Sequence, residues 1–250
     1  MDVSTTDFLP LLLAALVIGF SKTSIGGAGT IAVAIFAFVL PAKESTGIIL
    51  PLLILGDVFA ISIYRRHAEW GLLVRLFPSV AVGVVAGAGF VRVVDDTVMR
   101  RSIGALLVLL VVIHLWRSRR LRRRGDVVPM TPTARRLAAV GFGFLAGFST
   151  MVANAGGAPM SIYLFTMGLG VMSFLGTGAW FFFIVNVFKV PFSVGLGLIS
   201  AESLWLDLKL APAVVVGALI GWWLAKRIDQ KKFEGWVLGL SVVSGLNLLR

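Results

Sequence analysis

Three ionisable residues of this chain, Lys22, Asp57 and Lys189, lie within long apolar stretches. A charged side chain deep in a bilayer is costly, so each of these residues needs a partner or a function. We interpret them as the charges of an anion site, in which Lys22 or Lys189 supplies the positive charge. Asp57 would carry a proton, or would neutralise a lysine when the substrate is absent. The simpler alternative is that Asp57 pairs with a lysine only to hold two helical bundles together.

Two glycine-rich stretches interrupt the apolar sequence at related places. One is GFSKTSIGGAGT, from Gly19 to Thr30, and the other is GFSTMVANAGGAPM, from Gly147 to Met160. At membrane depth, a broken helix must have its free backbone groups buried in protein or facing a wet cavity. Paired breaks of this kind indicate the binding site of a transporter, because helix N-termini at a break attract anions. Alternatively, the glycines only permit close helix packing.

The candidate site residues follow from these two observations. Those expected to contact the substrate are the polar and glycine residues of the two stretches: Ser21, Lys22, Thr23, Ser24, Gly26, Gly27, Ser149, Thr150, Asn154, Gly156 and Gly157. Those expected to serve coupling or charge pairing are Asp57, Asn186 and Lys189.

The composition limits the class of protein. Of 250 residues, 58% are hydrophobic and only 14% are charged, which is too little charge for a soluble domain. Apolar runs of about 16–25 residues recur along the chain, enough to cross a bilayer. The sequence therefore predicts an all-α polytopic membrane protein.

About ten helical elements are expected. The five before the central basic segment are Phe8–Phe20, Ile25–Leu40, Thr46–Tyr64, Leu72–Val91 and Val98–Trp116. The five after it are Leu137–Phe148, Ala155–Gly170, Phe174–Leu198, Leu204–Ala225 and Phe233–Leu249. The first two elements of each half are expected to be broken helices or hairpins that meet at the glycine-rich motif.

The two halves resemble each other in an ordered series of matches. Thr46-Gly47 matches Thr177-Gly178, Asp57 matches Asn186, and Pro78-x4-Gly83-x3-Gly87 matches Pro212-x4-Gly217-x3-Gly221. We therefore expect a first repeat over 1–116, a basic cytoplasmic linker over 117–136 and a second repeat over 137–250. Five crossings, or three crossings and a hairpin, turn the second copy upside down, which predicts inverted-topology repeats. The Gly83/Gly87 and Gly217/Gly221 pairs are interpreted as helix-packing faces.

The basic residues that give the net charge of +11 cluster in loops beside apolar stretches. This distribution indicates how the chain is oriented in the membrane. Placing 117–136 in the cytoplasm satisfies the positive-inside rule and puts both termini outside. The expected partners are a small anionic substrate and membrane lipids, including anionic head groups at the cytoplasmic face, with no nucleic acid. A homodimer is a further option.

Catalysis, metal binding and cofactors are not predicted. The chain has no cysteine, and His67 and His114 lie in or near different loops, away from Ser21 and Ser149. The membrane segments offer essentially one carboxylate, whereas a metalloenzyme needs several convergent ligands.

The paired Gly-Phe-Ser to Gly-Gly-Ala stretches, the Thr-Gly pairs and the Pro-x4-Gly-x3-Gly helices resemble the TauE/SafE family of permeases. The resemblance spans nearly the whole chain. It implies a bacterial or archaeal inner-membrane transporter of small sulfur-containing or organic anions, such as sulfite and sulfonates. It also implies that the glycine-rich segments, here Gly19–Gly29 and Gly147–Ala158, face the substrate.

We therefore predict a secondary transporter that works by alternating access around an anion site between the repeats. No GxxxxGK[ST] nucleotide-binding motif is present, so a gradient or the membrane potential would drive it, with proton coupling through Asp57 as a hypothesis. The alternative is an anion channel built on the same site. An accessory subunit would not account for the paired polar breaks.

Overall fold

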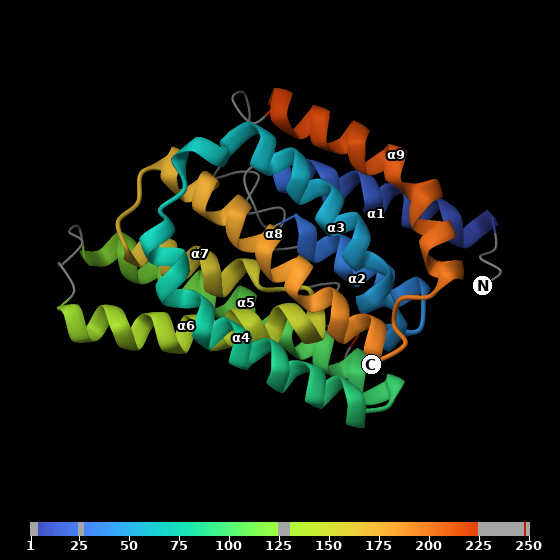
Figure 1. Ribbon diagram of the computed structural model, residues 1–250, viewed down its shortest axis with the longest axis horizontal. Helices are drawn as coiled ribbons and strands as arrows, with labels where there is room; N and C mark the ends of the chain where they lie inside the picture. The colour runs from blue at the N-terminus through green and yellow to red at the C-terminus, as the bar shows by residue number, and fades with distance from the viewer. Residues whose placement is uncertain (1–4, 25–27, 125–130, 225–247, 249–250) are drawn as a thin grey trace.

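The computed structural model describes residues 5–24, 28–124, 131–224 and 248 (Figure 1). Within them the protein is helical, and the predicted all-α class is confirmed. The α-helices are α1 (Thr5–Thr23), α2 (Gly29–Val39), α3 (Ala42–Tyr64), α4 (Trp70–Val93), α5 (Asp96–Arg124), α6 (Pro132–Ala153), α7 (Gly157–Thr166), α8 (Val171–Gly195) and α9 (Ala201–Leu224). A 3-10 turn, η1 (Arg65–His67), links α3 to α4. The tenth expected element, Phe233–Leu249, lies outside the described residues except for Leu248.

Six of these helices, α1, α3, α4, α6, α8 and α9, are long and apolar enough to cross a membrane. Their outer faces carry exposed large apolar side chains, among them Val74 on α4, Val171 on α8 and Trp205 on α9. An exposed apolar surface of this extent suits a lipid environment, and the protein is a multi-pass membrane protein.

The two glycine-rich stretches separate helices, as predicted. The first break lies between the end of α1 at Thr23 and the start of the 11-residue α2 at Gly29. The second lies between the end of α6 at Ala153 and the start of the 10-residue α7 at Gly157, so the two ends of each stretch are helical. At the second break Asn154 adopts the left-handed conformation, with φ of 48° and ψ of 29°. The amide of Ala155 then donates to Ser149 O at 3.2 Å, which satisfies one of the last carbonyls of α6.

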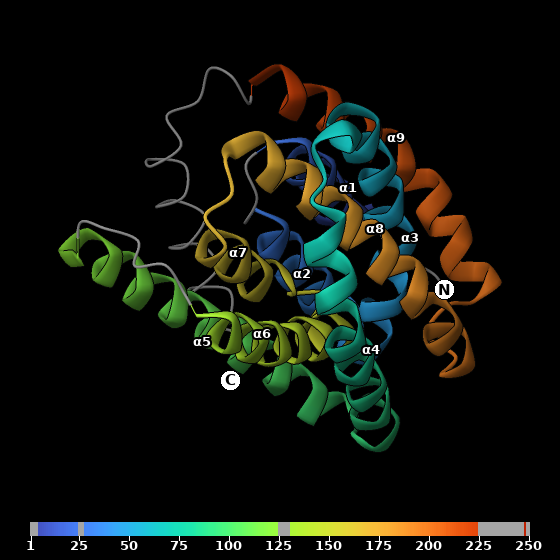
Figure 2. The ribbon, with the colours of Figure 1, turned by 60° about the vertical axis from the view of Figure 1, so that its left-hand side comes forward.

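α1 and α9 lie side by side on one flank, α4 and α6 lie together on the opposite flank, and α3 and α8 cross between them (Figures 1 and 2). In Figure 1, α1, α3 and α9 run in one direction, and α4, α6 and α8 run in the other. Among the described helices, the matching pairs α1 and α6, α3 and α8, and α4 and α9 therefore run in opposite directions.

Glycines allow α1 and α9 to pack backbone against backbone. A Cβ atom on Gly19 would lie 2.7 Å from Ala218 N, and one on Gly217 would lie 3.0 Å from Phe20 N. A Cβ on Gly221 would lie 3.0 Å from the Cα atom of Phe20. Such distances leave no room for a side chain, so these glycines are required for the contact.

The contact between α4 and α6 repeats this pattern with the matching residues. A Cβ atom on Gly147 would lie 3.0 Å from Val84 N, and one on Gly83 would lie 2.8 Å from Phe148 N. A Cβ on Gly87 would lie 2.8 Å from the Cβ atom of Met151. The predicted packing role of the Pro-x4-Gly-x3-Gly helices is confirmed on both flanks.

One predicted match between the halves was wrong by two residues. Gly47 packs against Leu198, and the equivalent close approach in the second half is made by Gly176 against the turn that follows Tyr64. A Cβ on Gly178, the predicted counterpart of Gly47, would meet nothing within 4 Å. Gly47 and Gly176 are separated by the same number of residues as Asp57 and Asn186, whereas the two Thr-Gly dipeptides are farther apart in the sequence.

Candidate functional site

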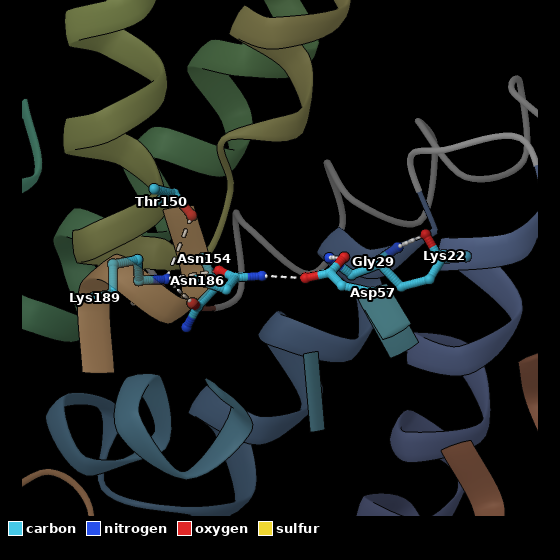
Figure 3. A network of polar contacts seen from close by, with 8 residues as sticks. Lys22, Gly29, Asp57, Thr150, Asn154, Asn186 and Lys189 are labelled. Atoms are coloured by element: carbon cyan, nitrogen blue, oxygen red, sulfur yellow. Dashed lines mark hydrogen bonds and ion pairs between the residues drawn. The ribbon is translucent and has the colours of Figure 1, made fainter. Parts of the chain in front are cut away.

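A chain of polar contacts joins α1, α3 and α8 (Figure 3). Lys22 Nζ on α1 lies 2.6 Å from Asp57 Oδ1 on α3. The second oxygen of Asp57, Oδ2, accepts a hydrogen bond from Asn186 Nδ2 on α8 at 2.7 Å. Asn186 Oδ1 in turn accepts from Lys189 Nζ at 3.4 Å. The structure thus joins all four of these residues, which the sequence had singled out.

This polar chain is shielded from solvent. The side chain of Asp57 is fully buried, and that of Lys22 is 14% exposed. Asn186 and Lys189 are each 1% exposed. At such depth electrostatic interactions are stronger than in water, and an ammonium without a counter-charge is costly.

The two lysines have different surroundings. Lys22 is paired with a carboxylate, whereas Lys189 donates to three neutral oxygens: Asn154 Oδ1 at 2.5 Å, Thr150 Oγ1 at 3.4 Å and Asn186 Oδ1. Among the described residues, no carboxylate lies within ion-pair distance of Lys189. Lys189 is therefore the ammonium best placed to accept an anionic partner.

Asn154 connects the second glycine-rich break to both halves of the chain. Its Oδ1 accepts from Lys189, and its Nδ2 donates to the backbone oxygen of Thr46 on α3 at 2.9 Å. The left-handed backbone at Asn154 ends α6 and sets the position from which the amide makes both contacts. The break is therefore part of the polar chain and does more than terminate a helix.

The aromatic ring of Phe182 is a site neighbour that sequence reasoning missed. Lys22 Nζ lies 4.7 Å from the ring centroid, a cation–π arrangement. On the other side, a Cβ atom on Gly157 at the start of α7 would lie 3.9 Å from Phe182 Cζ. The spacing of Phe182, Asn186 and Lys189 places them on one face of α8 and was the available signal.

Several hydroxyl groups of the predicted substrate set are engaged in contacts between or within helices. Ser21 Oγ accepts from Gly29 N at 2.9 Å and so caps α2. Thr23 Oγ1 donates to Ala218 O on α9 at 2.7 Å. Ser149 Oγ donates to Leu145 O within α6 at 2.6 Å. These three hydroxyls hold the framework around the polar chain.

The remaining predicted residues occupy the edges of the two breaks. Ser24 is 5% exposed, and its hydroxyl has no hydrogen-bond partner within the described ranges. Gly156 packs against Thr150, since an added Cβ would lie 3.0 Å from the threonine Cβ atom. An added Cβ on Gly157, the first residue of α7, would meet only Phe182 Cζ among the described residues. Gly26 and Gly27 lie outside the described residues.

Comparison with known proteins gives one match. The family model described as sulfite exporter TauE/SafE matches residues 11–248. No curated protein and no solved structure matches the chain.

Proposed function

Because the chain belongs to the TauE/SafE sulfite exporter family, we propose that it is a secondary transporter of small sulfur-containing or organic anions, of the sulfite and sulfonate class. In this proposal it works by alternating access, as predicted from the paired breaks in its helices. The family is one of membrane transporters of sulfite or related anions, and the six apolar helices agree with it.

The observation that carries the proposal is the environment of Lys189. Its ammonium is buried, has only neutral acceptors and lies beside a helix break. An anion at this position would receive a charge-assisted hydrogen bond from Lys189 and further bonds from the Asn154 and Asn186 amides. The N-terminus of α7, which begins at Gly157 near the ring of Phe182, would add a favourable dipole.

The arrangement of the helices supports two inverted repeats, over 1–116 and 137–250, joined by the basic linker over 117–136. Matching helices point in opposite directions, and matching glycines make matching contacts on the two flanks. The polar chain has Lys22 and Asp57 from the first half and Asn154, Asn186 and Lys189 from the second. Because each flank pairs a helix of one half with a helix of the other, motion of the α1/α9 flank against the α4/α6 flank would open the site to alternate sides and keep the close glycine contacts.

The membrane is proposed to be a bacterial or archaeal plasma membrane, with both termini outside and the basic linker against anionic lipid head groups. Coupling to protons is assigned to Asp57, the buried carboxylate between the two lysines. A homodimer remains compatible with this scheme.

The test is flux of sulfite and of an alkylsulfonate in proteoliposomes, comparing wild type with Lys189→Ala and with the exposed-lysine control Lys209→Ala. Lys189→Ala should lower flux about tenfold or more, because losing a hydrogen bond to a charged group costs about 1.5–3 kcal/mol. The control should transport at the wild-type rate. Undiminished flux in Lys189→Ala would show that the anion binds elsewhere in the protein. A single-channel conductance far above the turnover of a transporter would favour the channel alternative.

A further inference from the structure

The charges of the polar chain do not balance. It contains two ammonium groups, Lys22 and Lys189, and one carboxylate, Asp57. With all three ionised, the buried site holds one positive charge in excess. That excess sits on the Lys189 side, because Asp57 is in direct contact with Lys22.

We propose that the site selects anions by charge: with Asp57 ionised it holds one negative charge, and it takes a doubly charged anion only together with a proton on Asp57. This inference rests on the proposed function, since it specifies how the same anion site is filled. The physical reason is that a net charge buried in a medium of low dielectric is costly, so the filled site tends to neutrality.

Asn186 makes this switching possible, because its amide separates the carboxylate from Lys189. Its Nδ2 faces Asp57 and its Oδ1 faces Lys189. When Asp57 takes up a proton from the solvent, Lys22 loses its counter-ion and can offer its charge to a second negative group. The proton adds to Oδ1, the oxygen that faces Lys22, so this ion pair breaks while the hydrogen bond from Asn186 Nδ2 to Oδ2 is kept.

Few other charges bear on Asp57. The charged groups close to it are Lys22, in contact, and Lys189, through Asn186. α9 also packs on α3. Its charged residues, Glu202, Asp207 and Lys209, lie at least about one helical turn before Val214, the residue that meets α1 at Gly19. Among the side chains that the structure describes, the charged or titratable groups on α3 and the elements packed on it, besides Lys22, Asp57 and Lys189, are Asp7, Lys43, Glu44, Tyr64, Arg65, Arg66, His67, Asp96, Arg100, Arg101, Arg135, Arg136, Glu202, Asp207 and Lys209.

Methanesulfonate and sulfoacetate are suitable probes, because the first carries one negative charge and the second carries two at neutral pH. Isothermal titration calorimetry at pH 7, in two buffers with different heats of ionisation, counts the protons taken up with each anion. For wild type in lipid nanodiscs we expect about one proton per sulfoacetate and about none per methanesulfonate, by proton linkage.

An isosteric variant changes the charge of the site. Asp57→Asn leaves two positive charges and no carboxylate in the polar chain, so sulfoacetate should bind without proton uptake and in preference to methanesulfonate. A melting temperature near the wild-type value confirms that the variant folds, and the proton counts of the wild type test the rule independently of it.

The outcomes separate the two proposals. If both anions bind to wild type with equal proton uptake, or if Asp57→Asn keeps the wild-type preference, the charge rule is overturned and the transporter proposal stands. If neither anion binds to wild type, the sulfonate site itself is wrong, and the charge rule falls with it.

Discussion

Asn154 has the only positive φ among the non-glycine residues that the structure describes. Asparagine tolerates this conformation better than most residues. Its side chain also links Lys189 to the backbone of α3. One residue thus ends α6, holds the buried ammonium and connects the two halves of the chain.

Two substitutions separate these roles. Asn154→Gly keeps the backbone conformation without strain but removes the amide, so we expect near-wild-type folding with anion affinity about tenfold lower. Asn154→Ala removes the same amide and adds about 1 kcal/mol of left-handed strain, so it should also melt at a lower temperature. Calorimetric affinity and thermal unfolding in detergent measure the two effects. Equal melting temperatures would show that the backbone conformation has no energetic role.

For individual residues, the sequence predicted which charged and amide side chains belong to the site, but it did not predict which of them contact each other. The offset between the halves paired Asp57 with Asn186, and the two touch in the structure. The contact of Lys189 with Asn154 was not predictable, because it depends on the left-handed turn in the second glycine-rich stretch, which is two residues longer than the first. The roles of Ser21 and Thr23 were equally hidden, since a hydroxyl that binds substrate and one that caps a helix look alike in sequence.

At the scale of elements, the helix pairs α1/α9 and α4/α6 form the flanks, and each brings a first helix of one half against a fourth helix of the other. The Pro-x4-Gly-x3-Gly spacing predicted which faces would pack. It did not predict the partners, because small-residue faces are compatible with any close helix neighbour. The partners turned out to be Gly19 and Gly147, which open the two glycine-rich stretches.

The packing role can be tested within a single helix. Gly147→Val places a side chain against the backbone of α4, whereas a Cβ on Gly141 of the same helix meets nothing within 4 Å. Gly147→Val should destabilise the protein by about 1–3 kcal/mol or more through overpacking, and Gly141→Val should stay near wild type. Thermal unfolding of the purified variants compares them. Similar loss in both would show that close packing at Gly147 is not the cause, since valine has a higher helix propensity than glycine.

At the scale of the whole molecule, the absence of cysteine gives a clean test of orientation. Single cysteines introduced in the 117–136 linker should react with a membrane-impermeant maleimide only after the membrane is permeabilised. A cysteine at residue 2 should react in intact cells, because both termini are expected outside. Labelling of the linker in intact cells would show that the orientation in the membrane is the reverse of the expected one. It would not change the relation between the two halves.

The contact between α1 and α9 has a consequence for the synthesis of the protein. Thr23 donates to the backbone of Ala218, which is 195 residues later in the chain. A ribosome adds about 5–20 residues per second, so α1 waits on the order of 10–40 s before its partner exists. During that time its glycine face meets lipid or the insertion machinery, and a chain that stops before α9 leaves that face uncovered. Docking of α9 against α1 therefore belongs to the last stage of biogenesis, and an uncovered α1 is a feature by which membrane quality control could recognise an unfinished chain.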